Sequence, residues 1–265
     1  MKGWESGGIV VGYSGDGAGR AALAWGAAEA GRRGCPLVLC VAWQYPVEGT
    51  AGVAEDAVLG AAEAVVREGV RLAGGGRVVT VCEKERPSIL LLRVAASADL
   101  LVLGASRSAE SGMLGAGSVS ARVLASATSP VVVVRGAEGG GGVVVGWDGS
   151  PSATAAVAWA AQEAALRRAP LRVLQFSERG RGEATADDVG RLLGRQLEQV
   201  RDLEVRVLSD EPVAGLIDAS RSAGLVVVGA RGLGMVRAAA LGSVSQALVL
   251  AAHCPVAVIR SARDA

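Results

Sequence analysis

The sequence predicts an α/β protein made of two similar domains, each with a doubly wound parallel sheet and helices on both faces. Three observations support this prediction. Short runs rich in Val and Leu alternate with longer Ala-rich segments that have helical periodicity. The short runs are apolar on both faces, which is typical of parallel strands buried between helices. The pattern of the first half of the chain recurs in the second half, which indicates duplication of a whole domain.

The repeat is clear at both ends of the domain. Residues 10–37 match residues 144–171 at a shift of 134 without a gap, with 14 of 28 positions identical. Residues 101–135 match residues 226–260 at a shift of 125, with 12 of 35 identical. Because the shift falls by nine, the second copy is nine residues shorter in its middle. We expect a first domain over residues 1–136 and a second over 142–265, joined by the Gly-rich linker 136–142.

The expected elements alternate between strand and helix throughout. In the first copy, strands are predicted at about 8–13, 37–43, 77–82, 100–104 and 130–135, and helices at about 17–33, 54–73, 87–97 and 117–127. In the second copy, strands are predicted near 143–147, 171–176, 203–208, 225–229 and 256–260. This alternation gives right-handed βαβ units, and such sheets bind ligands beyond the carboxyl ends of their strands, where the strand order reverses.

Composition argues against several classes of partner. The formal net charge is +1, and the sequence has no basic run or stripe that would suit a phosphate backbone. We therefore expect no nucleic-acid partner. No apolar run reaches about 18 residues, and the candidate at 89–105 is broken by Arg93 and Asp99, so we expect no membrane span. The N-terminus leads into a strand pattern and not into the apolar region of a signal peptide. We therefore expect a cytoplasmic protein.

The cysteines and the single histidine are not obvious catalytic groups. Cys35, Cys40, Cys82 and Cys254 form no Cys-x-x-Cys pair and lie at or near predicted strands, where Cys behaves as a small apolar residue. His253 closes a predicted helix, a position where a lone His is more often a helix-end residue than a catalyst.

Three segments of the second copy converge on the expected binding edge. The first is the turn after the first strand, residues 146–152, which contains Gly146 and Asp148. The Asp148 carboxylate can accept hydrogen bonds from ribose hydroxyls, or it can bond the backbone of its own turn. Ser150 or Ser152 is expected to cap the next helix, with Pro151 at an early helical position.

The second segment contains two glycine-containing motifs, one after a predicted strand and one before a predicted helix. Gly229 ends a predicted strand, Gly232 follows two residues later, and Gly242 and Ser243 open a helix after nine more. Glycines allow backbone amides to approach an anion, and a helix N-terminus offers free N–H groups and a positive dipole end. The Ser243 hydroxyl could bind phosphate or a metal. The alternative is a mobile loop followed by an ordinary capped helix.

The third segment is the end of the second strand, which carries Phe176. An aromatic ring at that edge can stack against a base. Plain core packing is the alternative, and the sequence alone does not decide between the two.

Together these motifs resemble the universal stress protein family. The resemblance rests on Val-Gly-Trp-Asp-Gly-Ser at the first strand tip, the helix with Trp159, and Gly-x2-Gly-x9-Gly-Ser from Gly229 to Ser243 followed by Val244. It covers essentially the whole chain, twice, and its glycine motif is typical of the ATP-binding branch of that family. The resemblance implies Rossmann-like domains of the adenine nucleotide alpha hydrolase type, with strand order 3-2-1-4-5.

The family pattern also implies a ligand and its contacts. It implies ATP, alone or with Mg²⁺, with the base near the tips of strands one and two and the phosphates on the glycine loop. The residues implied to bind this nucleotide are Gly146 at the strand tip, Asp148 on the ribose, Phe176 beside the adenine, and Gly229, Gly232, Gly242, Ser243 and Val244 on the phosphates. Family members dimerise through their last strands. Here segments 130–135 and 255–260 would pair within one chain as a pseudo-dimer, and two chains could associate further.

The first copy departs from this pattern in two places. Ser14 stands where Asp148 stands, and Arg107 stands where Gly232 stands. Arg107 brings a side chain, and backbone strain if the position requires a positive φ, although Arg also binds phosphate well. Asp16 lies two residues late and could replace the missing carboxylate. We expect a weak or empty first site, although the rest of the motif remains in Gly104, Gly117 and Ser118.

Three functions follow from this sequence. The leading prediction is a nucleotide-binding protein of stress response or signalling, in which slow ATP hydrolysis is the most turnover expected. The second is a ligand-free scaffold or protein-interaction module of the same fold. The third is an adenylating enzyme, for which Ser14 to Gly17 resembles the required Ser-Gly-Gly-x-Asp-Ser loop only faintly, and kinship of fold does not transfer chemistry.

Overall fold

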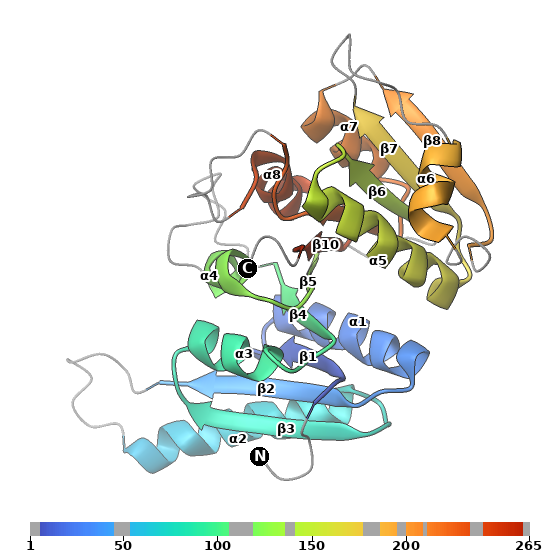
Figure 1. Cartoon of the computed structure of the whole chain (residues 1–265). Helices are drawn as coiled ribbons and strands as arrows, with labels where there is room; N and C mark the ends of the chain where they lie inside the picture. Colours follow the sequence, from blue (N-terminus) through green and yellow to red (C-terminus); the bar gives the residue numbers. More distant parts are fainter. Residues whose placement is uncertain are drawn as a thin grey trace. The chain divides into compact units, whose positions relative to one another are not determined.

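A computed structural model gives the structure of the chain and describes residues 6–44, 54–105, 119–135, 141–176, 186–194, 200–208, 211–233 and 241–261. These residues fall into two compact units that divide between Val134 and Arg135. Each unit is an α/β domain with a parallel sheet and helices on both of its faces (Figure 1). The fold class expected from the sequence is therefore confirmed.

In the first unit, the chain alternates strictly between strand and helix. Its elements are β1 (Ile9–Gly12), α1 (Gly17–Arg33), β2 (Leu37–Trp43), α2 (Glu55–Leu72), β3 (Val78–Lys84), α3 (Pro87–Ala95), β4 (Leu100–Gly104), α4 (Val119–Ser126) and β5 (Val131–Val134). The strands lie side by side in the order β3-β2-β1-β4-β5, and every pair is parallel. The order reverses between β1 and β4.

The second unit repeats the first. Its elements are β6 (Val143–Trp147), α5 (Pro151–Arg167), β7 (Leu171–Phe176), α6 (Ala186–Leu193), β8 (Leu203–Leu208), α7 (Pro212–Ala219), β9 (Leu225–Gly229), α8 (Ser243–Ala251) and β10 (Val256–Ile259). Its strand order is β8-β7-β6-β9-β10, again parallel, so both units have the 3-2-1-4-5 order that the resemblance implied. The reversal lies between β6 and β9.

The repeat extends to the register of the strands. Ile9 pairs with Leu37 in the first unit, and Val143 pairs with Leu171 at the equivalent place in the second. Ile9 also lies opposite Leu100 on β4, and Val143 lies opposite Leu225 on β9. These pairs preserve the shifts of 134 and 125 found in the sequence.

The helices form two layers around each sheet. In the first unit α1 contacts α2 and α3 contacts α4, while in the second α5 contacts α6 and α7 contacts α8. The central strands are fully buried between these layers, because β1, β4, β6 and β9 consist mainly of Val, Leu and Ile with almost no exposed surface. The apolar runs that predicted parallel strands are thus the cores of the two domains.

The expected element limits agree with the structure to within a few residues. The largest change in a strand is at β3, which continues to Lys84, past the expected end at residue 82. Residues 136–140 of the linker lie outside the described part of the chain, as do 106–118. Gly141 and Gly142 pack closely in the second unit, because a Cβ on Gly141 would lie 1.8 Å from the Ser222 carbonyl oxygen. The flexible segment expected at 136–142 therefore does not include its last two residues.

Candidate functional site

The turn after β6 places Asp148 at the carboxyl edge of the second sheet. Gly149 has φ +81°, which lets the chain reverse toward α5. The Ser150 backbone N–H donates to Oδ1 of Asp148 at 2.9 Å, and the Ser150 hydroxyl accepts from Ala153 N–H at 3.2 Å as the N-cap of α5. Of the two caps left open by the sequence, Ser150 is the one used, with Pro151 in the first turn.

Asp148 also reaches the glycine loop that follows β9. Its second oxygen, Oδ2, accepts from the Leu233 backbone N–H at 3.0 Å, across 85 residues of sequence. Ser150 makes a second bridge, because its hydroxyl donates to the Arg231 carbonyl oxygen at 3.2 Å. The self-bonded turn that the sequence left as an alternative is therefore present, and the same carboxylate contacts the loop.

The two loop glycines are required by close packing. A Cβ on Gly229 would lie 2.7 Å from the Ala153 backbone nitrogen, so β9 can meet the start of α5 only with glycine there. A Cβ on Gly232 would lie 2.7 Å from Oδ2 of Asp148. Neither residue has a positive φ. Backbone strain is thus not the reason for glycine at this point of the motif, contrary to the possibility raised for Arg107 in the first copy.

The N-terminus of α8 lies beside this loop. Gly242 is the N-cap and offers no side chain to the first turn, while its own N–H donates to the Ala230 carbonyl oxygen at 2.8 Å. The buried Ser245 hydroxyl contacts the carbonyl oxygens of Ala230 at 3.3 Å and Gly242 at 2.9 Å. Ser243, the first residue of α8, is exposed. The structure thus brings the glycine loop and the helix N-terminus together.

Ser243 and Val244 both lie in the first turn of α8, as the motif requires. Their backbone N–H groups belong to the set that has no partner within a helix. Sequence reasoning missed Ser245, which holds the loop to the helix. The sequence did contain a signal for this serine, because both copies share the motif Gly-Ser-Val-Ser, which ends at Ser120 in the first copy and at Ser245 in the second.

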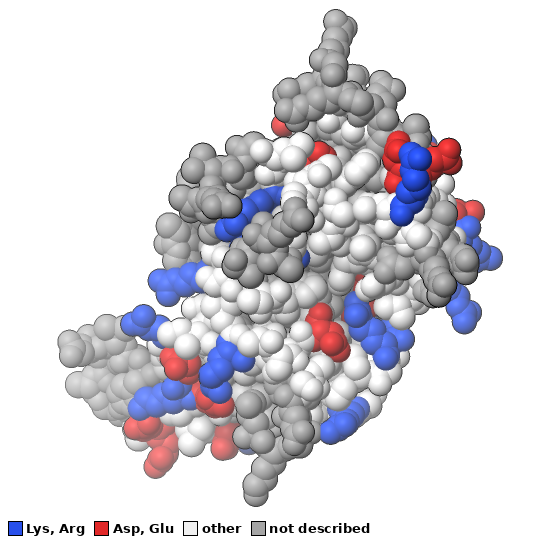
Figure 2. All heavy atoms as spheres, in the orientation of Figure 1, with Lys and Arg blue, Asp and Glu red and all other residues white. Residues whose placement is uncertain are grey.

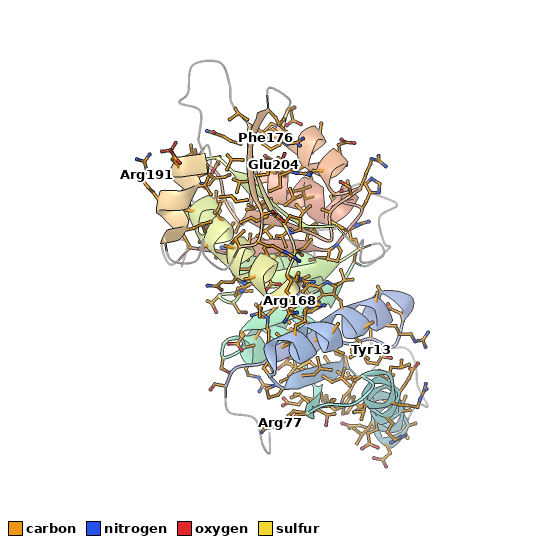
Figure 3. The ribbon with its side chains drawn as sticks, turned by 90° about the vertical axis from the view of Figure 1, so that its right-hand side faces the viewer. Tyr13, Arg77, Arg168, Phe176, Arg191 and Glu204 are labelled. Carbon is orange, nitrogen blue, oxygen red and sulfur yellow. The ribbon has the colours of Figure 1, made fainter. Side chains whose placement is uncertain are left out.

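Phe176 is the last residue of β7 and is labelled in Figure 3. Its ring lies directly on α7, because a Cβ on Gly215 would meet its Cε1 atom at 2.5 Å. Gly146, inside β6, faces the same helix, and a Cβ there would lie 3.0 Å from Leu216. The packing alternative for Phe176 is therefore present, and the ring is half-buried, with part of its surface open at the carboxyl edge.

The corresponding turn of the first unit uses its polar residues differently. The Asp16 carboxylate accepts from Gly19 N–H at 2.7 Å as the N-cap of α1, and from the Ser14 hydroxyl at 2.9 Å. The Gly19 hydrogen bond is the main reason why the pKa of Asp16 lies below its usual value. Arg20 and Glu68 join α1 to α2 next to this turn, with 2.8 Å between their charged atoms.

Asp16 therefore acts as the N-cap of α1 in the structure. Gly104 ends β4 as Gly229 ends β9, with a Cβ there lying 2.2 Å from the Ala18 carbonyl oxygen. The remaining motif positions of the first copy, Arg107, Gly117 and Ser118, lie outside the described residues.

Other candidate groups are placed away from these contacts. His253 lies just beyond the C-cap of α8, where its backbone N–H donates to the Ser220 hydroxyl at 2.9 Å. Burial raises the pKa of the Cys40 thiol to about 12 and that of Cys254 to about 11. These two thiols thus behave as small apolar groups, while Cys35 and Cys82 are half-buried.

Within the described ranges, no three His, Cys, Asp or Glu residues are grouped so that they could hold a metal ion. Among the helices that the structure describes, none combines the length and the hydropathy needed to cross a bilayer. On the face drawn in Figure 2, described acidic and basic side chains lie interspersed.

The fold and the site together define a class of protein: a duplicated, doubly wound α/β domain with a glycine loop and a helix N-terminus at the switch point of its second sheet. The model of the universal stress protein family matches residues 7–135 and again residues 142–260. The chain belongs to this family, in its tandem form.

Relatives of known sequence and structure agree. The universal stress protein Rv2005c of Mycobacterium tuberculosis is 33% identical over 292 residues, which cover 96% of this chain and 97% of that protein. The match to Rv2028c of the same species is 38% identical but spans 135 residues, about half of either chain (46% of this one and 48% of that one). A universal stress protein structure from Archaeoglobus fulgidus aligns with a TM-score of 0.75 over 98% of both chains, at 18% identity, and shows the fold.

Proposed function

We propose that the second domain binds an adenine nucleotide and that this binding underlies a role in stress response or signalling in the cytoplasm. The observation that carries the proposal is the meeting of three segments at the switch point of the sheet. The Asp148 carboxylate contacts the glycine loop through Leu233, and that loop contacts the N-cap of α8 through Gly242 and Ala230. A ligand placed there would touch all three segments.

The residues present fit a nucleotide with separate sugar and phosphate ends. Gly242 leaves the first turn of α8 without a side-chain cap, so the N–H groups of Ser243 and Val244 can bind phosphate oxygens. The negative charge of Asp148 favours the uncharged ribose hydroxyls at the other end. The half-buried ring of Phe176 provides an apolar wall for the base. We propose ATP as the ligand, and the Ser243 hydroxyl would be available to bind its phosphate or an accompanying Mg²⁺.

The first domain is proposed to be a structural partner with a weak or empty site. Ser14 and Arg107 stand where Asp148 and Gly232 stand in the second domain, and the Asp16 carboxylate caps α1 and accepts from the Ser14 hydroxyl. Restoring Arg107→Gly and Ser14→Asp together tests this assignment, since it should raise nucleotide stoichiometry. The pairing of segments 130–135 and 255–260, and further association of two chains, stay predictions of the family resemblance.

Two other functions are less well supported. A ligand-free scaffold would not need the intact Gly-x2-Gly-x9-Gly-Ser spacing and the Asp148 carboxylate that the second copy has. Catalysis by Asp148 as a general base is disfavoured because both of its oxygens already accept backbone hydrogen bonds. We therefore propose a binding protein with slow or absent turnover.

The test is calorimetric titration of ATP with Mg²⁺ into the wild type and the Gly232→Arg variant. We expect one site per chain, lost in the variant because its Cβ alone would lie 2.7 Å from the Asp148 carboxylate. Gly60→Arg is the matched control, since Gly60 has nothing within 4 Å of an added Cβ. No binding to the wild type would favour the scaffold. Two sites per chain would show that the first domain also binds.

A further inference from the structure

Two residues at the start of α5 hold the loop after β9. The Ser150 hydroxyl donates to the Arg231 carbonyl oxygen at 3.2 Å, and Oδ2 of Asp148 accepts from Leu233 N–H at 3.0 Å. We call these two bonds the clasp. Ser150 is 2% exposed, whereas the Leu233 side chain is 56% exposed, so the clasp joins a fixed helix end to a loop at the surface.

The clasp fixes the direction of a backbone amide in the glycine loop. In a trans peptide the carbonyl oxygen and the following N–H point in opposite directions. Because Ser150 binds the Arg231 carbonyl oxygen, the Gly232 N–H must point away from α5. Leu233 N–H is held by Asp148 on the next peptide. Without these bonds both peptide planes could rotate, and the amide would lose its direction.

The first domain has the same two residue types at these positions in the opposite order. Residues 148 and 150 are Asp and Ser, whereas the equivalent residues 14 and 16 are Ser and Asp. Both arrangements cap their helix, by Ser150 on Ala153 N–H and by Asp16 on Gly19 N–H. In the first domain the two side chains bind each other at 2.9 Å. Exchanging the residues thus preserves the helix cap.

From these contacts we propose that Ser150 is a positioning residue for phosphate. It touches no ligand; its hydroxyl orients the Arg231–Gly232 peptide so that the loop amide is ready for an anion. The proposal rests on nucleotide binding by the second domain. The role proposed for Ser150 differs from that of Asp148, which would bind the ribose directly. The buried Ser150 hydroxyl would not contact the ligand, and it would control affinity for the phosphate end of the nucleotide.

Three substitutions separate the clasp from the helix cap. Ser150→Thr retains both the hydroxyl donor and the cap. Ser150→Gly removes the hydroxyl but leaves a residue that is nearly as good an N-cap, and Ser150→Ala removes both. The backbone at residue 150 has φ −66° and ψ 157°, which any of these residues adopts.

The experiment measures thermal stability and the binding of ATP and of adenosine by calorimetry. We expect Ser150→Gly to keep the wild-type Tm, to lose about tenfold in ATP affinity and to retain adenosine affinity, because one aligned hydrogen bond is lost. Ser150→Thr should bind ATP as the wild type does. Ser150→Ala should lose both ATP affinity and Tm.

Other results would overturn the proposal in distinct ways. Equal ATP affinity in Ser150→Gly and the wild type would show that the hydroxyl does not position the loop. Equal losses in the Gly and Thr variants would show the same. If the wild type binds no adenine nucleotide, the proposed function fails, and the clasp is then judged by amide hydrogen exchange of residues 229–233. Exchange no faster in Ser150→Gly than in Ser150→Thr would overturn the clasp itself.

Discussion

The two copies end their first helix with different residues in the same backbone conformation. Gly34 has φ 63° and Arg168 has φ 51°, and both donate their N–H to carbonyl oxygens of the last helical turn. Glycine adopts this left-handed conformation without strain, while a residue with a Cβ does not. Arg168, at the end of α5 in Figure 3, is the one non-Gly residue with positive φ among those described.

Replacing Arg168 by Gly should therefore stabilise the second domain. We expect an increase of about 0.5–1 kcal/mol in the free energy of unfolding, because the strained φ is relieved. Gly34→Arg is the mirror experiment and should lower the stability of the first domain by a similar amount. Urea denaturation of both variants measures the effect. Stabilisation by both substitutions would contradict the strain argument.

Single residues were predicted unevenly from the sequence. Gly229 and Gly232 could be singled out because their spacing is unusual, and Asp148 because it follows directly after a predicted strand. The Leu233 and Arg231 backbone groups that complete the site could not, because any residue type supplies an N–H and a carbonyl oxygen. Such contacts depend on how two loops meet in space, so they cannot be predicted from the types of the residues involved.

Within elements, α2 shows how one residue type can have opposite effects at two positions. Gly60 is exposed, with nothing within 4 Å of an added Cβ. Gly69 is buried, and an added Cβ would lie 2.7 Å from Leu39 and 3.0 Å from the Tyr13 ring. Leu39 and Tyr13 are themselves buried in the core, so they have little room to move.

The same substitution should consequently change sign along this helix. Gly60→Ala should stabilise the protein by about 0.5–1 kcal/mol, since Ala is the better helix former. Gly69→Ala should destabilise it by about 1–2 kcal/mol, since overpacking outweighs that gain. Thermal or urea unfolding of the two variants provides the comparison. If both stabilise, the packing around Gly69 is looser than described.

Strands and helices were predicted well because their signal is local. The buried runs of β1, β4, β6 and β9 are short, rich in Val and Leu and apolar on both faces, which is typical of parallel strands between helices. The role of Phe176 was left open for a physical reason. Its ring contacts Gly215, 39 positions further along the chain, and periodicity does not report such long-range packing.

At the scale of the whole molecule, the two domains serve as controls for each other. They share strand order and register, so each strand of one domain has an equivalent in the other for comparison. A ligand that binds the native second domain stabilises it by about 2.7 kcal/mol at a hundred times its Kd. The first domain gains this only if it also binds ligand or unfolds together with the second.

Saturating ATP should therefore slow amide exchange more in β6 and β9 than in β1 and β4. Hydrogen-exchange mass spectrometry with and without ATP gives this comparison within one chain. Gly232→Arg should abolish the difference, and Gly60→Arg should retain it. Equal slowing in both domains of the wild type would place nucleotide in both, or show that they unfold as one unit.

The exchanged Asp and Ser at the first turn also bear on how a duplicated gene can diverge. Either order of the pair gives α1 or α5 its cap, by Asp16 or by Ser150. Selection for folding therefore cannot distinguish the two orders, and drift between them is nearly neutral while one copy still performs the task. In the second copy the same turn also contacts the loop after β9, through Ser150 and Asp148. After duplication of this domain, one copy can thus lose ligand binding and still be kept as a folded domain.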